Sequence, residues 1–299
     1  MDADDAAPLL RDQTIDINGL ERAYHLKLPE SPENNPLVII LHGHTGSHDQ
    51  TIGDESGKSP MKLWLNLAEE EDFVVAVPNG TLGPEDTRGW NDCRSDSDRN
   101  PDSDDVLFLS QLIDELTTEY NLNSQRVYVA GLSNGAAMAM RLAQEIPTKL
   151  AAIACIVNNL PLNSKCTDST TPISVLYMNG TADPLIPYEG GQVASNGGQV
   201  QSTDRSIAYW IERNGTDQTA VVEELADVDK DDGSSISKFT YPNGSDNTEV
   251  VLYRVMGGGH TSPSLVERYS SLYKVVVGSQ NGDIEMSSAV WDFFESKSR

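Results

Sequence analysis

Residues 126–145 read RVYVAGLSNGAAMAMRLAQE, and this stretch decides the fold class. Residues 126–130 form a β-rich apolar run, and residues 136–145 form an alanine-rich run typical of a helix. Between them, residues 131–135 match the pattern G-x-S-x-G, which in a strand–turn–helix setting forms a sharp turn that exposes the serine hydroxyl. An ordinary Gly-Ser turn is the alternative for the pentapeptide alone. The strand before it and the helix after it favour Ser133 as a nucleophile.

The same alternation of apolar runs and amphipathic stretches continues on both sides of this segment. Strands are predicted at residues 37–41, 73–77, 151–157, 173–178 and 249–255, and helices at 64–71, 106–120 and 287–294. Because strands this continuously apolar are buried on both faces, the pattern predicts an α/β fold with a mainly parallel central sheet covered by helices on both faces. We expect one domain over residues 1–299, with an N-terminal extension at 1–20 and a surface excursion or hairpin at 227–247.

The chain is strongly acidic, with 21 lysines and arginines against 46 aspartates and glutamates and a formal net charge of −25. Nucleic acid and anionic membrane surfaces are therefore not expected as partners. The sequence has no run of about 18 apolar residues, so it predicts no membrane span.

The cysteines and the first residues of the chain are the features that can indicate whether the protein is cytoplasmic or exported. The chain has three cysteines, which allow at most one internal disulfide, and the sequence leaves the pairing open among Cys93, Cys155 and Cys166. The opening MDADDAAPLL lacks the basic and apolar regions of a secretory signal. A cytoplasmic protein and a mature exported enzyme would both begin this way.

A serine nucleophile needs a general base, and in this type of fold the chain order is serine, acid, histidine. Of the five histidines only His260 follows Ser133, in a glycine-rich loop directly after a predicted strand. We predict Asp183 as the acid, because it follows the strand at 173–178 on a loop from which a carboxylate can reach the imidazole. An Asx turn is the alternative for Asp183, and other carboxylates lie between the serine and the histidine: Asp168, Asp204 and Asp217.

Two backbone N–H groups must stabilise the oxyanion, one from the residue after the nucleophile and one from a loop after an early strand. Asn134 supplies the first, and His44, in the loop after residues 37–41, is our candidate for the second. His42, His44 and His48 could instead bind zinc as alternate histidines of one loop. No H-E-x-x-H pattern accompanies them, so no metal site is predicted.

Trp90 lies between Gly89 and Asn91 in a polar stretch, where an indole can stack on an aromatic acyl group or a sugar. We therefore name it as a candidate substrate-binding residue. Arg94 nearby can meet a substrate carboxylate, although an exposed charge is the simpler interpretation.

Five segments together resemble the polyhydroxybutyrate depolymerase and feruloyl esterase-like group of α/β-hydrolases. They are LHGHTG at 41–46, GWNDC at 89–93, the block from 104 to 139, GTADPLIPYEGG at 180–191 and GGGHTSP at 257–263. The resemblance implies an α/β-hydrolase fold and a secreted carboxylic ester hydrolase that acts on feruloyl or related plant cell-wall and aryl esters. Hydroxyalkanoate polyesters and acetylxylan are the alternative substrates within the group.

Two positions depart from the family pattern. Thr216 stands where the family often has a cysteine, so a disulfide of the family is not expected here. Ser262 stands where the family usually has a tryptophan, so we expect a different acyl pocket. Acyl transfer by a serine, a histidine and an aspartate needs no cofactor. A serine peptidase and a non-catalytic binding protein are the alternatives from other classes, and hydrolysis of a simple chromogenic ester separates both from an esterase.

Overall fold

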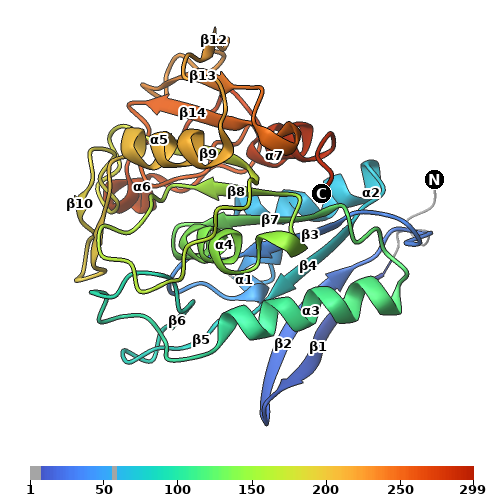
Figure 1. Cartoon of the computed structure of the whole chain (residues 1–299). Helices are drawn as coiled ribbons and strands as arrows, with labels where there is room; N and C mark the ends of the chain where they lie inside the picture. Colours follow the sequence, from blue (N-terminus) through green and yellow to red (C-terminus); the bar gives the residue numbers. More distant parts are fainter. Residues whose placement is uncertain (1–7, 56–58) are drawn as a thin grey trace.

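A ten-stranded sheet runs through the computed structural model, which describes residues 8–55 and 59–299 (Figure 1). In spatial order its strands are β1 (Leu9–Ile17), β2 (Leu20–Lys27), β4 (Val74–Pro78), β3 (Leu37–Leu41), β7 (Val127–Leu132), β8 (Ala152–Ile156), β9 (Ser174–Gly180), β14 (Val250–Met256), β13 (Ser235–Tyr241) and β12 (Val221–Glu224). Neighbouring strands are parallel from β4 through to β14, and the pairs toward both edges are antiparallel. The predicted α/β class with a mainly parallel sheet is confirmed.

Helices cover both faces of this sheet (Figure 1). One face carries α3 (Asp105–Glu119), α4 (Asn134–Glu145) and α5 (Thr203–Asn214), and the other carries α2 (Leu63–Glu70) and α7 (Met286–Phe294). The pleat of β3 shows why two cores form, because Leu37, Ile39 and Leu41 join the first core while Val38 and Ile40 join the second. In residues 8–55 and 59–299, no helix combines the length and apolarity needed to cross a membrane.

Shorter elements shape the loops above the sheet. They are α1 (His48–Ile52), α6 (Ser271–Val277), the paired strands β5 (Thr81–Leu82) and β6 (Arg88–Gly89), the paired strands β10 (Gly191–Gln192) and β11 (Gln199–Val200), and single turns of 3₁₀ helix at Pro60–Lys62, Pro147–Lys149 and Ser245–Asn247. Most follow the carboxyl ends of the parallel strands, where active sites of such sheets lie.

The expected N-terminal extension at residues 1–20 is wrong for the part that the structure describes. Residues 9–17 are β1, which pairs with β2 and forms one edge of the main sheet. Residues 1–7 of that expectation lie outside the described residues. An edge strand is only partly covered, so LLRDQTIDI mixes polar and apolar residues and lacks the apolar run of a central strand.

The expectation of a surface excursion or hairpin at 227–247 is corrected in part. Residues 235–241 are β13, which lies between β14 and β12 in the main sheet and buries Ile236. β12 and β13 pair antiparallel, and all residues of β12 are exposed. The segment is polar because β13 is the second strand from the edge of the sheet and is only partly covered.

The disulfide joins Cys93 to Cys166, a pairing that the sequence left open. It ties the loop after β6 to the loop after β8. Cys155 is a free thiol buried in β8.

Candidate active site

Ser133 lies on the turn between β7 and α4, with φ 55° and ψ −118°, a conformation that residues other than glycine rarely adopt. Side chains on the flanking residues would not fit. A Cβ on Gly131 would lie 2.2 Å from the carbonyl oxygen of Gly135, and one on Gly135 would lie 2.3 Å from that of Leu41. The close approach of strand and helix therefore holds the serine in the strained turn, with the positive end of the α4 dipole beside its hydroxyl.

The structure brings Ser133, His260 and Asp183 together, from the loops that follow β7, β14 and β9. His260 Nε2 lies 2.8 Å from Ser133 Oγ, and His260 Nδ1 lies 2.7 Å from Asp183 Oδ2. The other carboxylate oxygen, Oδ1, accepts the N–H groups of Leu185 and Ile186, both at 2.8 Å. An Nδ1–H that donates to Asp183 leaves the Nε2 lone pair free to accept the serine proton.

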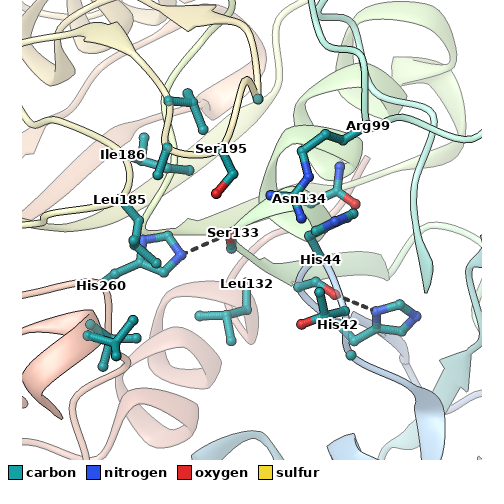
Figure 2. A pocket seen from close by; sticks show the side chains of 18 of the residues that line it. His42, His44, Arg99, Leu132, Ser133, Asn134, Leu185, Ile186, Ser195 and His260 are labelled. Carbon is teal, nitrogen blue, oxygen red and sulfur yellow. Dashed lines mark hydrogen bonds between the residues drawn. The ribbon is translucent and has the colours of Figure 1, made fainter. Parts of the chain in front are cut away.

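The loop after β3 lies beside Ser133. A Cβ on Gly43 would lie 3.4 Å from the Cβ of Ser133, so the two segments are in contact. Within the described part of the chain, the backbone N–H of neither His44 nor Asn134 donates a hydrogen bond, and both residues line the pocket around Ser133. Figure 2 shows the side chains of both residues on the same side of Ser133.

His42 fixes this loop as a neutral ring. Its Nδ1 donates to the carbonyl of Gly43 (2.7 Å), and its Nε2 accepts the N–H of Gly80 (2.9 Å). Burial lowers the pKa of His42 to about 4. Burial also lowers the pKa of His44 to about 4, and the His44 ring bonds the hydroxyl of Thr87 at 3.1 Å. Both rings are therefore neutral at pH 7.

The predicted role of Trp90 in substrate binding is wrong, because its indole is fully buried. The indole Nε1–H donates to the carbonyl of His42 (2.9 Å), and the two rings pack with their centroids 5.0 Å apart. The Trp90 N–H donates to Oδ1 of Asn134 (2.6 Å). Trp90 thus holds the loop after β3 and the start of α4 together.

A buried ion pair behind Asn134 was missed by the sequence analysis. Asp92 accepts a hydrogen bond from Asn134 Nδ2 at 2.7 Å and pairs with Arg94 at 2.5 Å. Burial alone would raise the pKa of Asp92, but the guanidinium of Arg94 holds it below its usual value. Arg94 is only 6% exposed, which corrects the interpretation of an exposed charge. Only the closeness of an acidic and a basic residue in NDCR signals such a pair in the sequence.

Asn158 was also missed, and its side chain holds the turn at Ser133. Its Nδ2 donates to the carbonyl of Ser133 at 2.6 Å, from the end of β8. Two adjacent asparagines directly after a predicted strand are the sequence signal that could have indicated it.

Ser133 opens onto a cavity of about 770 Å³ (Figure 2). Its lining combines apolar side chains with polar and cationic ones: Leu132, Leu185, Ile186, Tyr269, Ser97 and Arg99 among them. A cavity of this size and mixed lining suits an organic ester with a ring or a chain of several carbons.

Two of the histidines that the sequence grouped as alternative zinc ligands have other partners: His42 bonds Gly43 and Gly80, and His44 bonds Thr87. Among the described residues, ligand atoms of Asp12, His25, His48 and Asp49 lie within 4.8 Å of one another. Nδ1 of His25 accepts the N–H of Asp12 (3.0 Å), and Nδ1 of His48 accepts the N–H of Asp49 (2.9 Å). Because Nδ1 accepts in each ring, the ring proton lies on Nε2, the atom that would have to bind a metal.

Comparisons with known proteins match this chain to esterases. A family model described as Phospholipase/Carboxylesterase matches residues 27–199. The protein named "Putative esterase NocK" from Nocardia uniformis subsp. tsuyamanensis is 32% identical over 292 residues, which cover 93% of this chain and 80% of that protein. "Probable feruloyl esterase C" from Aspergillus niger is 25% identical over 66% of this chain and 70% of that protein. An acetyl xylan esterase structure from Aspergillus awamori aligns with a TM-score of 0.55 over 88% of this chain and 97% of that one, at 15% identity, which is a likeness of fold alone.

Proposed function

This chain belongs to the phospholipase/carboxylesterase family of α/β-hydrolases and is a carboxylic ester hydrolase, and we propose that it works through Ser133, His260 and Asp183. The observation that carries the proposal is the unbroken chain of contacts from Asp183 Oδ2 to His260 Nδ1 (2.7 Å) and from His260 Nε2 to Ser133 Oγ (2.8 Å), at the floor of a cavity. A serine in this position can be deprotonated as it attacks.

In the proposed reaction, His260 Nε2 takes the proton of Ser133 as Oγ attacks the ester carbonyl carbon. The carbonyl oxygen becomes negative and accepts hydrogen bonds from the N–H groups of His44 and Asn134. His260 then gives its proton to the leaving alcohol oxygen as the C–O bond breaks. A water that loses its proton to His260 attacks the acyl carbon of the acyl-enzyme. His260 then returns that proton to Ser133 Oγ as the bond between Oγ and the acyl carbon breaks and the carboxylic acid leaves. Asp183 stabilises the imidazolium in both halves.

We place the substrate among feruloyl and related aryl esters. Two features support this choice: a relative carries the name feruloyl esterase, and the cavity lining includes apolar and aromatic side chains suited to an aryl group. Tyr269 and Tyr273 line the same cavity as Leu185 and Ile186. Flat aromatic groups pack well against such walls.

Polyester is a second candidate substrate, favoured by the exposed apolar face of α6. Leu272 is 83% exposed, Val275 82% and Val276 61%, and Val276 also lines the cavity. The His260 N–H donates to the carbonyl of Val277, so this helix lies directly against the loop that carries His260. An apolar surface continuous with the cavity could lie on a solid neutral polymer.

The test compares wild type with Ser133→Ala on p-nitrophenyl acetate and butyrate, methyl ferulate, acetylated xylan and polyhydroxybutyrate. We expect wild-type hydrolysis of at least one ester and a loss of roughly 10⁴-fold or more in kcat in the variant. Ser110→Ala, on α3 and outside the cavity lining, is the matched control and is expected to keep full activity. Full activity in Ser133→Ala would overturn the proposed nucleophile.

The same panel separates the substrate classes. A preference for methyl ferulate supports the aryl-ester assignment, and cleavage of polymer particles ahead of every soluble ester supports the polyester one. Cleavage of a chromogenic peptide with no ester hydrolysed would indicate a peptidase. No hydrolysis of any compound would favour a binding protein.

We further propose that the protein works outside the reducing cytoplasm, because it carries the Cys93–Cys166 disulfide close to its site. Structural disulfides persist mainly in oxidising compartments. Mass spectrometry of the protein from its native cells, alkylated without reduction, tests this. Alkylation of Cys93 and Cys166 in that sample would argue for a cytoplasmic protein.

A further inference from the structure

The charged side chains that line the catalytic cavity are both cationic. Arg94 and Arg99 line it, and among the described residues no aspartate or glutamate does. This sign is opposite to that of the chain as a whole, which carries 46 acidic and 21 basic residues. A positive group in a partly enclosed cavity attracts an anionic group of a ligand.

Arg94 is not available to bind a ligand, because all three nitrogens of its guanidinium already donate hydrogen bonds within the protein. Its Nε and Nη2 donate to the Asp92 carboxylate, and its Nη1 donates to the carbonyl of Gly197 at 2.7 Å. Its charge is compensated by Asp92, which is fully buried. The cation that remains available is therefore Arg99.

Arg99 donates through Nε to Glu85 Oε2 at 2.9 Å, and in the described part of the chain neither of its Nη atoms has a hydrogen-bond partner. Its side chain is 22% exposed, whereas that of Glu85 is 54% exposed, so the pair lies at the cavity mouth with the acid toward solvent. Figure 2 shows the Arg99 side chain extending beside Asn134 and His44, across Ser133 from Leu185 and Ile186.

The segment that carries Arg99 is fixed relative to the reacting serine. Ser97 Oγ donates to Asn100 Oδ1 (3.2 Å), and Asn100 Nδ2 donates to Asp92 Oδ1 (2.9 Å). The other oxygen of Asp92 accepts from Asn134 Nδ2 (2.7 Å). One buried carboxylate thus anchors both the Arg99 segment and a proposed oxyanion residue, so the guanidinium needs little reorganisation to meet a substrate.

We propose that Arg99 is a specificity-determining residue, which binds a carboxylate on the ester substrate through its two Nη groups. This inference rests on the proposed function, because the carboxylate must belong to an ester whose carbonyl reaches Ser133. The planar guanidinium edge matches the two oxygens of a carboxylate. The neutral ring of His44 beside it adds no competing charge.

The test uses ester pairs of equal shape that differ only in charge. One pair is 4-acetoxybenzoate and 4-acetoxybenzamide, in which the anion is on the leaving group. The other is monomethyl adipate and methyl 6-amino-6-oxohexanoate, in which the anion is on the acyl group. We expect the wild type to show a kcat/KM roughly 10- to 100-fold higher for the carboxylate than for the amide in one pair, and that pair identifies the half of the substrate that Arg99 holds.

Two variants should move this preference in opposite directions. Arg99→Gln is expected to bring the carboxylate-to-amide ratio to within about 2-fold of unity, since the charged donor is lost. Glu85→Gln removes the anion beside the guanidinium and is expected to raise the ratio about 2- to 5-fold. Arg205→Gln, an exposed arginine on α5 outside the cavity lining, makes the same change of net charge and should leave the ratio at the wild-type value.

The inference is overturned if the wild type shows no carboxylate preference in either pair, or if Arg99→Gln keeps the wild-type ratio. Equal losses in Arg99→Gln and Arg205→Gln would attribute the effect to net charge, and this outcome also overturns it. Failure of the proposed function looks different, because Ser133→Ala would then retain hydrolysis of p-nitrophenyl acetate or the wild type would lack it. A protein that cleaves p-nitrophenyl acetate and ignores the carboxylate contradicts only the role of Arg99.

Discussion

The Asp183 carboxylate is held by two different kinds of donor, and this makes its replacement informative. In Asp183→Asn, the N–H groups of Leu185 and Ile186 select the amide oxygen, because they can only donate. The amide NH₂ then faces Nδ1 of His260, which must accept, so the ring proton moves to Nε2. That tautomer cannot take the proton of Ser133, and we expect kcat on p-nitrophenyl acetate to fall roughly 10³- to 10⁴-fold.

The control for this variant is Asp204→Asn, which alters another acid between the serine and the histidine. The Asp204 side chain is 66% exposed and pairs with Arg254 on the surface, so its replacement should leave kcat within about 2-fold of wild type. A circular dichroism spectrum identical to that of wild type shows that each variant is folded. If Asp183→Asn retains more than a tenth of the activity, another group orients His260.

Single residues differed in how far the sequence could identify them. Ser133 and His260, which the structure brings within hydrogen-bonding distance, could be paired from the sequence because only one histidine follows the serine motif and the fold class sets the chain order. Trp90 was misassigned because its neighbours are polar, and polarity alone cannot tell an exposed loop from one whose polar groups are paired internally. Asn91 illustrates this, since its N–H donates to the buried Asp105 at 2.7 Å.

The loop between β3 and α1 contains the buried His42, and we expect this residue to make the protein less stable in acid. The pKa of His42 falls from 6.5 in the unfolded chain to about 4 when folded, because burial disfavours the charged ring. The unfolded state therefore binds the proton first as the pH falls. Neutral His42 therefore makes its full contribution to the free energy of unfolding above pH 6.5. This contribution declines between pH 6.5 and 4 and is lost below pH 4. It amounts to about 3 kcal/mol in total.

Urea unfolding at pH 7.5 and pH 5 checks this prediction. We expect the free energy of unfolding of the wild type to fall by about 2 kcal/mol from His42 alone over that interval. In His42→Gln the side chain does not titrate, so the drop should be smaller by that amount. Equal drops in both proteins would show that another group causes the acid sensitivity.

Elements at the centre of the sheet were predictable, and those at its edges were not. β3, β7, β8 and β9 are buried on both faces, so their sequences are continuous apolar runs that leave little doubt about their state. β1 and β13 have partly exposed residues, and their mixed sequences look like those of loops. The helix α5 was missed although Ser202 caps it and Gly215 ends it, because three of its six buried residues are polar, which leaves only Ile207, Trp210 and Ile211 as an apolar signal.

At the scale of the whole molecule, the chain has a net charge of −25, while the charged side chains that line the cavity at Ser133 are arginines. The acidic residues outnumber the cations available to pair with them. Surface pairs such as Arg11–Asp54 and Lys149–Asp114 are exposed and contribute about 0–1 kcal/mol each. Repulsion among the unpaired carboxylates is therefore the larger electrostatic effect on stability at low ionic strength.

This balance predicts that salt stabilises the protein at neutral pH. Raising NaCl from 0.05 to 1 M shortens the Debye length from about 14 to about 3 Å, which screens repulsion between separated carboxylates more than it weakens contacts at 3 Å. We expect Tm at pH 7.5 to rise with NaCl, most steeply below about 0.5 M. Near pH 4.3, where the net charge approaches zero, the same titration should shift Tm much less. A Tm that falls with NaCl at pH 7.5 would mean that the surface ion pairs outweigh the repulsion, and an equal rise at both pH values would assign the effect to ion-specific hydration instead of charge.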